Sequence, residues 1–321
     1  MCRCQRIELS LFDLRVKSNN VYRQPISLTW LRSCLVVLLL LALAACSQED
    51  TSSLKSDADD LIQNKGSDTI VNLALAWAER YHQIRPEVEI AVTGGGSGTG
   101  LAALINDTVD IANASRSIKP EELENAHAND VAPQEFVIAR DAIAVIVHPS
   151  NPVDQLSLQQ LSDIFSGKFH NWQQVGGDDR PIVRLSRETN SGTHVYFLET
   201  VVRLGDKEAA TLFSPDTLLL PSSEGIGEEI RHNPNAIGYD GLGYVTEDMK
   251  TLAVATHAEG PFWKPSIKNV NDGVYPISRN LYMYTNGNPN ERIEAYLDWI
   301  RSPDAQAIVA ELGFVPLVDV E

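Results

Sequence analysis

Apolar and polar residues alternate with two different periods along most of the chain. Ile70, Leu73, Ala74, Trp77 and Tyr81 recur at intervals of three and four residues, which predicts an amphipathic helix directly after residues 66–69 (GSDT). Residues 88–93 alternate and are rich in β-branched side chains, which predicts a strand. The same patterns predict strands at 110–114, 136–147, 182–185, 236–239 and 274–284, and helices from 101, from 120, and at 158–165, 193–204, 223–230 and 291–312. Strands that alternate with helices in this way favour a mainly parallel α/β fold.

Three of the predicted junctions carry glycine and hydroxyl residues directly before a helix begins. They are residues 66–69 (GSDT), 93–100 (TGGGSGTG) and 187–193 (RETNSGT), and Ser115 with Arg116 ends a further strand. Ser67 or Asp68 is suited to cap the first helix through a side-chain oxygen. The unpaired N–H groups at a helix start, together with the positive end of its dipole, favour an anion. The sequence therefore predicts an anion site built from these junctions.

The motifs of several enzyme and nucleotide-binding classes are absent from the same segments. Gly100 is followed by Leu101 rather than by Lys, so residues 93–100 are not a Walker loop, and no register fits the dinucleotide spacing. Thr99 breaks the nucleophile-elbow pattern around Ser97. His194 has no partner identifiable from sequence, and no histidine pair has metal-ligand spacing. We therefore expect binding without turnover, with no cofactor, metal or catalytic residue; a phosphate-ester hydrolase that uses Ser97 or Ser191 is the enzymatic alternative.

The first 45 residues have the features of a secretion signal. Residues 35–45 are all Leu, Val or Ala, follow Arg23 and Arg32, and end at Cys46. This run is too short to span a bilayer, which needs about 20 residues, and it suits a signal-peptide apolar region. Cys46 after small residues resembles a bacterial lipobox, which implies cleavage before it and lipid attachment to its thiol. The alternatives are an uncleaved anchor or a buried helix, and the long polar stretch before the run suggests a true start further along.

Composition narrows the possible partners and the chemistry of the remaining chain. The net charge is −17, and removal of residues 1–45, which hold six Lys or Arg and two Asp or Glu, would lower it to −21. Such an acidic protein is poorly suited to nucleic acid. All four cysteines lie at or before Cys46, so the rest of the chain can form no disulfide. Residues 46–65 are polar and acidic, and we expect them to form a flexible tether.

The ordered set of motifs resembles the phosphate-binding lipoproteins of bacterial ABC phosphate importers. The set comprises the lipobox and residues 66–69, 96–100 (GSGTG), 110–116 (DIANASR), 158–172, 187–193, 236–239 (AIGY) and 275–279 (YPISR). The resemblance implies a two-lobed periplasmic binding protein fold of class II type, with two mainly parallel sheets joined by two crossing strands. Lobe I would be residues 66–141 and 277–321, lobe II residues 142–276, and the crossings near 140–142 and 276–280. The lobes would close on one dehydrated phosphate.

The resemblance and the junctions together give a phosphate-binding set. It consists of Ser67, Asp68, Thr69, Ser97, Gly98, Thr99, Ser115, Arg116, Arg187, Ser191, Gly192 and Thr193. Some members carry an aspartate at the position of Arg116. The carboxylate of that aspartate accepts the hydrogen bond from the proton of hydrogen phosphate. A site of donors alone would discriminate poorly between phosphate and sulfate. We expect Asp68 to be the acceptor here, with Asp141 and Glu188 as alternatives.

The function that the resemblance implies is extracytoplasmic capture of phosphate by hinge closure and delivery to an ABC permease. We expect a monomer that is anchored to a bacterial membrane through acylated Cys46 and lies in the periplasm or on the cell surface. Ser47 and Gln48 favour the outer membrane in a Gram-negative cell. A receptor for sulfate, molybdate or tungstate, and a sensory or adhesive lipoprotein, are the alternatives.

Overall fold

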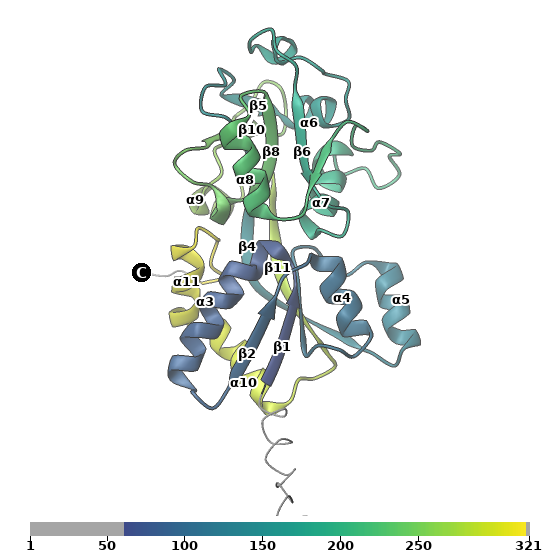
Figure 1. Cartoon of the computed structure of the whole chain (residues 1–321), viewed down its shortest axis with the longest axis vertical. Coiled ribbons are helices and arrows are strands. Elements are labelled where there is room, and N and C mark those ends of the chain that lie inside the picture. The colour runs from purple at the N-terminus through teal and green to yellow at the C-terminus, as the bar shows by residue number, and fades with distance from the viewer. Residues whose placement is uncertain (1–60, 319–321) are drawn as a thin grey trace, which may run out of the picture. The chain divides into compact units, whose positions relative to one another are not determined.

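The computed structural model describes residues 61–318 (Figure 1). The predicted signal peptide, Cys46 and most of the predicted tether lie outside the described residues. The tether prediction is wrong at its end, because β1 (Leu61–Gly66) is a strand of the central sheet. The Ile62 side chain of β1 is fully buried against Ile70 and Trp77. The core therefore holds this short strand, although most of its residues are polar. No helix among residues 61–318 is long and apolar enough to cross a membrane.

Lobe I, which we define as residues 61–142 and 278–318, contains three parallel strands. β1 pairs with β2 (Glu89–Thr93) on one side and with β3 (Ile111–Ala114) on the other. Its helices are α3 (Asp68–Ile84), α4 (Ser97–Ile105), α5 (Pro120–Ala128), α10 (Glu291–Ile300) and α11 (Pro303–Glu311). The helix predicted from the spacing of Ile70 to Tyr81 is confirmed as α3, which buries that whole apolar face.

Lobe II, residues 143–277, contains a second parallel set. β6 (Val183–Arg187) pairs in parallel with β7 (Leu218–Leu220) and β8 (Ala236–Gly241). The other elements are β5 (Gln155–Ser157), β9 (Lys250–Thr251), β10 (Ala253–Ala255), α6 (Leu158–Phe165), α7 (Gly192–Phe197), α8 (Ser223–His232) and α9 (Ile267–Asn271), with short helical turns at Trp172–Val175, Leu198–Val202 and Leu242–Tyr244. Phe197 stacks on Tyr239 with ring centroids 3.6 Å apart in the core of this lobe.

Two long antiparallel strands connect the lobes. β4 (Pro133–Val147) pairs with β11 (Ser278–Asn286) as far as Ala142, and from Ile143 onwards it pairs with β8 of lobe II. The strands therefore form one continuous path, in the order β2-β1-β3-β11-β4-β8-β6-β7. The α/β prediction is confirmed, with the difference that antiparallel β4 and β11 join the two parallel sets into one mixed sheet. Figure 1 shows both strands running through the waist between the lobes.

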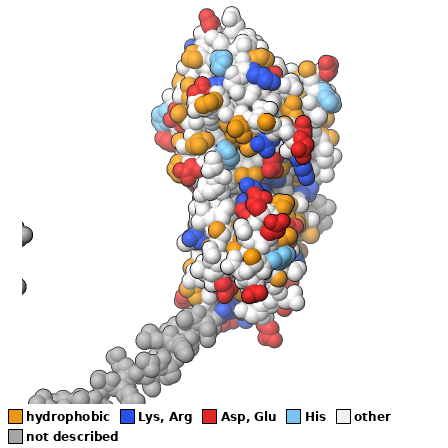
Figure 2. Space-filling model, turned by 90° about the vertical axis from the view of Figure 1, so that its right-hand side faces the viewer, with side chains coloured by type: hydrophobic (Ala, Val, Ile, Leu, Met, Phe, Trp, Pro, Cys, Tyr) orange, Lys and Arg blue, Asp and Glu red, His pale blue; other side chains and the backbone are white. Residues whose placement is uncertain are grey.

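Two local predictions differ from the structure. Ser67 occupies the N-cap position of α3, but its side chain makes no capping bond, because its hydroxyl is directed to Ser115 instead. The helix predicted at 193–204 is shorter in the structure, because α7 ends at Phe197, a helical turn follows at Leu198–Val202, and Leu204 is exposed with a φ of 56°. The helical period therefore does not persist through residue 204. On the face shown in Figure 2, Lys and Arg side chains lie beside Asp and Glu where the lobes meet.

Candidate functional site

Three serines of lobe I meet at the ends of its parallel strands. Ser67 follows β1, Ser97 begins α4, and Ser115 follows β3. The Ser67 hydroxyl donates to Ser115 Oγ at 3.0 Å, and Ser115 N donates to Ser97 Oγ at 3.0 Å. All three side chains are buried. Ligands of open α/β sheets lie beyond the carboxyl ends of the strands, and this is where the serines converge.

Lobe II contributes the first turn of α7 to the same place. The Thr193 hydroxyl lies 2.8 Å from the Thr69 hydroxyl of lobe I. A methyl group added at Gly192 would lie 2.5 Å from Ser115 Oγ and would also collide with Ser97 Oγ, so the two lobes are in direct contact here. Ser191 caps α7 by accepting a bond from Thr193 N at 3.2 Å. We call Ser67, Thr69, Ser97, Ser115, Gly192 and Thr193 the inner cluster.

Arg279 of β11 supplies a buried cation at the edge of the inner cluster. Its guanidinium donates to Thr193 Oγ1 at 3.0 Å and to the Ser115 carbonyl at 3.0 Å. It also pairs with Asp141, which lies directly opposite on β4, at 2.9 Å. Burial raises the pKa of Asp141, and the charge and hydrogen bonds of Arg279 oppose that rise. The register of the two crossing strands thus places an ion pair under the cluster.

Arg187, at the end of β6, connects the lobes through a second ion pair. Its guanidinium pairs with Asp68 at the start of α3 and donates to Ser223 Oγ at 2.8 Å. Ser223 in turn donates to Asp240 Oδ1 at 2.9 Å. Burial raises the pKa of Asp240 to about 6, although Arg187 acts in the opposite direction. Both arginines near the cluster are therefore already paired with carboxylates, and the cluster itself offers mainly neutral hydroxyl groups.

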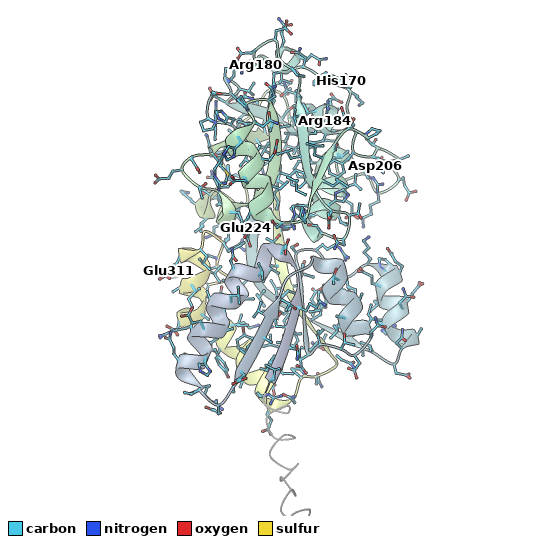
Figure 3. All side chains as sticks on the ribbon, viewed as in Figure 1. His170, Arg180, Arg184, Asp206, Glu224 and Glu311 are labelled. Carbon is cyan, nitrogen blue, oxygen red and sulfur yellow. The ribbon has the colours of Figure 1, made fainter. Side chains whose placement is uncertain are left out.

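The glycine run of lobe I contacts lobe II through its backbone. Gly98 N donates to the Asn190 carbonyl at 3.0 Å, and Asn190 Nδ2 donates to the Gly95 carbonyl at 2.9 Å. Gly96 has a φ of 91°, and a methyl group there would lie 2.9 Å from the Asn190 carbonyl oxygen. The run therefore needs glycine for close approach between the lobes. A further contact joins Asn72 of α3 to Glu224 of α8, which Figure 3 shows at the junction.

The structure brings together some of the predicted site residues and not others. Those that meet at or beside the inner cluster are Ser67, Asp68, Thr69, Ser97, Ser115, Arg187, Ser191, Gly192 and Thr193. Gly98 uses its N–H on Asn190, and the Thr99 hydroxyl donates to the Gly95 carbonyl. Glu188 is exposed.

Arg116 is directed away from the cluster, contrary to the expectation that it supplies charge there. Its guanidinium makes two bonds to Glu122 of α5, at 2.7 and 2.6 Å. Burial alone would raise the pKa of Glu122, but the hydrogen bonds from Arg116 and from Lys119 N outweigh this and lower it. The reason is local, because the first turn of α5 presents a carboxylate six residues from Arg116. The structure places Arg279 rather than Arg116 beside the cluster, and none of Arg279, Asn190 and Asp240 is among the site residues predicted from the sequence.

The contacts give little support for nucleophilic or metal chemistry. The hydroxyl of Ser97 lies 3.3 Å from Ser115 Oγ, and His194 is bonded to Ser186 rather than to Ser97 or Ser191. Burial lowers the pKa of His194. Within residues 61–318, no three His, Cys, Asp or Glu side chains are grouped as a metal site.

Comparison with known proteins identifies relatives over most of the chain. A family model described as the PBP superfamily domain matches residues 49–304. The phosphate-binding protein PstS of Pseudomonas aeruginosa is 33% identical over 273 residues, which cover 80% of this chain and 83% of that protein. The phosphate-binding protein PstS of Bacillus subtilis is 32% identical over 301 residues, which cover 89% and 95%.

Solved structures show the same likeness. A Clostridium perfringens structure, described as a phosphate ABC transporter substrate-binding protein with bound phosphate, has a TM-score of 0.72 and 30% identity, and the match covers 80% of this chain and all of that one. An ABC-type phosphate transport receptor from Vibrio cholerae has a TM-score of 0.64 and 29% identity, with coverage of 79% and 99%. The arrangement of lobes described above is therefore that of solved phosphate receptors.

Proposed function

We propose that this chain, which belongs to the PBP superfamily and within it to the PstS family of phosphate-binding proteins, binds inorganic phosphate between its lobes. The observation that carries the proposal is the convergence of buried hydroxyl groups from both lobes on one place, beside Arg279. The proposed hinge is the pair of crossing strands near residues 140–142 and 276–280. Closure about this hinge would present the captured ion to the membrane subunits of an ABC importer.

The chemistry of the inner cluster suits a tetrahedral oxyanion. Hydrogen bonds to a charged group contribute about 1.5–3 kcal/mol each, so a handful of donors would give micromolar or tighter binding. The starts of α3, α4 and α7 add N–H groups and the positive ends of helix dipoles. Transport receptors of this family bind their ligand without turnover, which disfavours the hydrolase alternative.

Calorimetry with phosphate, sulfate and molybdate tests the proposal. We expect saturable binding of phosphate with one ion per chain, and weaker binding of the other two anions. A preference for sulfate or molybdate would favour the alternative oxyanion receptors, and no heat with any of the three would refute the proposed function. Light scattering before and after addition of phosphate tests the proposed monomer.

We propose Asp68 as the acceptor for the proton of hydrogen phosphate. Of the three candidate carboxylates, Glu188 is exposed, whereas Asp141 is fully buried and accepts bonds from Arg279 and from Leu242 N. Asp68 is partly exposed, is adjacent to Thr69 of the inner cluster, and is held by Arg187. An acceptor favours the protonated ion, whereas fully ionised sulfate has no proton to donate.

The Asp68→Asn variant tests this assignment through the ratio of two affinities. The lost charge-assisted bond should reduce the preference for phosphate over sulfate by about 10- to 100-fold. Because both anions need the same closed lobes, a defect in closure alone would weaken both and leave the ratio unchanged. An unchanged ratio would therefore exclude Asp68, and Glu188→Gln is the matched control.

We further propose that Cys46 is lipid-modified and that the protein is a periplasmic or surface lipoprotein, attached to the outer membrane in a Gram-negative cell. The support is the run of Leu, Val and Ala that ends at Cys46, followed by Ser47 and Gln48. Metabolic labelling with radioactive palmitate should mark the protein, and a Cys46→Ser variant should remain unlabelled. Recovery of unlabelled wild-type protein in the soluble fraction would contradict the anchor.

A further inference from the structure

A cavity lies beside the inner cluster, where the lobes meet near α5 and the end of α7. It has a volume of about 520 Å³, and we call it the outer pocket. Lobe I lines it with Arg116 and Lys119, lobe II with Arg203 and Lys207, and β11 with Arg279. The lining residues Ser117, Lys207 and Asn280 are exposed, so solvent reaches the pocket.

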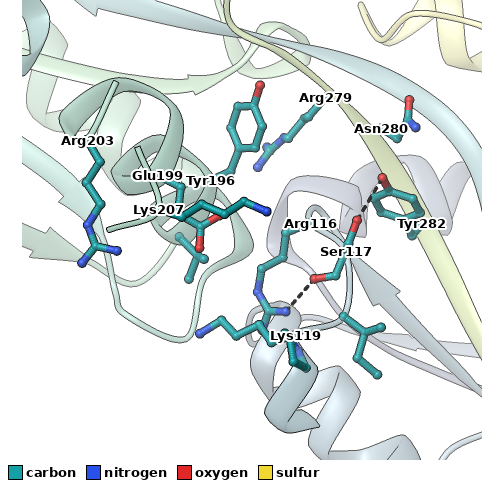
Figure 4. A pocket seen from close by; sticks show the side chains of 13 residues that line it. Arg116, Ser117, Lys119, Tyr196, Glu199, Arg203, Lys207, Arg279, Asn280 and Tyr282 are labelled. Atoms are coloured by element: carbon teal, nitrogen blue, oxygen red, sulfur yellow. Dashed lines mark hydrogen bonds between the residues drawn. The ribbon is translucent and has the colours of Figure 1, made fainter. Parts of the chain in front are cut away.

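The side chains of the outer pocket carry an excess of positive charge. Five of them are cationic and one, Glu199, is a carboxylate. Arg116 and Arg279 are compensated by Glu122 and Asp141, and Lys119 lies 3.8 Å from the exposed Glu121. Arg203 donates through Nε to the Thr211 carbonyl, and neither Arg203 nor Lys207 forms a salt bridge among the described residues. Figure 4 shows the Lys207 side chain extending from lobe II towards Arg116.

The sign of this charge is opposite to that of the protein as a whole. The chain has a net charge of −17, which at low salt repels a phosphate ion from most of its surface. At physiological ionic strength, charges more than about 8 Å away are largely screened. A small anion near the lobe junction therefore responds mainly to the side chains of the outer pocket, and these attract it.

We propose that the outer pocket is a weak encounter site for the oxyanion, which holds hydrogen phosphate between the lobes before the ion reaches the inner cluster. The inference rests on the proposed function, because the ligand is the same phosphate ion. Clefts lined by one sign of charge raise association rates by about 10- to 1,000-fold. The outer pocket supplies this attraction, whereas the inner cluster, whose nearby arginines are both paired, supplies hydrogen bonds.

Arg279 connects the two places. It lines the outer pocket and also donates to Thr193 and to the Ser115 carbonyl of the inner cluster region. The Tyr196 ring, another lining residue, lies 5.6 Å from the same guanidinium. Arg279 is therefore a side chain that the outer pocket and the inner cluster share, so an anion held by Lys207 and Lys119 would lie next to the cluster.

The dependence of the association rate on salt tests the proposal. The rate constant kon follows from koff, measured by chasing bound radiolabelled phosphate with unlabelled phosphate, and from Kd, measured by calorimetry. If the outer pocket governs the encounter, kon of the wild type falls as salt is raised, since a local attraction is screened. If the net charge governs it, kon rises with salt instead. Control by the outer pocket and control by the net charge therefore predict opposite signs for the dependence of kon on salt.

The variant Arg203→Gln/Lys207→Gln removes the two cations that lobe II contributes to the pocket. We expect kon at low salt to fall about 3- to 10-fold and its salt dependence to vanish or reverse. Lys268→Gln, which removes an exposed lysine outside the pocket, should keep the wild-type behaviour. The same salt slope in the double variant and the wild type, or a wild-type kon that rises with salt, would overturn the proposal. An absence of phosphate binding in calorimetry would instead refute the proposed function.

Discussion

The inner cluster and the outer pocket lie on two sides of Arg279 and differ in how they would hold an anion. In the inner cluster Ser97, Ser115 and Thr193 are fully buried, and the nearby arginines are neutralised by carboxylates. In the outer pocket, Lys207 is exposed and is not paired within the described residues. Neutral donors at fixed positions distinguish ions by shape, and the proposed acceptor Asp68 would distinguish them by proton content, whereas exposed charges attract any anion. The residues that would select the anion, in the inner cluster, are therefore different from those that would attract it, in the outer pocket.

Loss of Arg279 should have the largest effect, because it would leave a carboxylate buried without its cation. We expect Arg279→Gln to lower the free energy of unfolding by about 3–5 kcal/mol, measured by chemical denaturation. The variant Asp141→Asn/Arg279→Gln removes both charges and should recover much of this loss. Equal stability of the single and double variants would show that Arg279 does not stabilise the protein by compensating the charge of Asp141.

The buried Asp240 should make stability depend on pH. Its pKa is raised from 3.8 to about 6, so the folded state binds a proton that the unfolded state has already released. The contribution of protonated Asp240 to the free energy of unfolding is fully present below pH 4 and is lost as the pH rises through about 6. At about 1.4 kcal/mol per pH unit, the loss by pH 7 is about 3 kcal/mol. Asp240→Asn should lack this decline, so the difference between the two denaturation curves should grow from pH 4 to pH 7; a constant difference would contradict it.

A methyl group at Gly192 tests whether the inner cluster needs contact between the lobes. It would collide with Ser97 and Ser115 of lobe I, and such overpacking costs about 1–3 kcal/mol. We expect Gly192→Ala to weaken phosphate binding about 10- to 100-fold in calorimetry. Gly225→Ala is the control, since a methyl group there has only ordinary contacts. An affinity within twofold of the wild type would place the ligand elsewhere.

Arg116 should have the smallest effect of the four positions. Its charge is compensated by Glu122, which is partly exposed and can be hydrated when its partner is removed. We expect Arg116→Gln to cost about 1 kcal/mol of stability, near the value of a partly exposed ion pair, and to change the Kd for phosphate less than about threefold. A loss of affinity as large as that of Gly192→Ala would mean that Arg116 reaches the ligand after all.

Much of the fold could be predicted because it follows from local periodicity. The apolar face of α3 and the strand before the glycine run are clear in sequence, since burial of one face imposes a regular spacing. Leu61–Gly66 was missed because a short strand with Gln63, Asn64 and Lys65 has too little apolar content to show a pattern. The hydroxyl groups of the cluster could be located because they follow strands and precede helices.

The charged residues of the site could not be predicted in the same way. Whether Arg116 or Arg279 faces the cluster depends on pairing across the sheet, which brings Arg279 opposite Asp141, and on the Glu122 carboxylate of α5. The first contact joins strands far apart in the sequence, and the second spans the loop before α5, so neither leaves a periodic signal. The glycines of residues 94–98 were interpreted as a place for a ligand, whereas several of them accommodate Asn190 from the other lobe.

The strand β4 is continuous from Pro133 to Val147 and belongs to both lobes, and β11 runs antiparallel beside its first part. A pair of hydrogen-bonded strands resists sliding and stretching but can twist and bend, so the proposed closure would rotate the two lobes about essentially one axis. Under that proposal, the lobes would return to the same mutual alignment each time they close. The shared strands would then bring Thr69 and Thr193, which are 124 positions apart in the sequence, into the same contact each time.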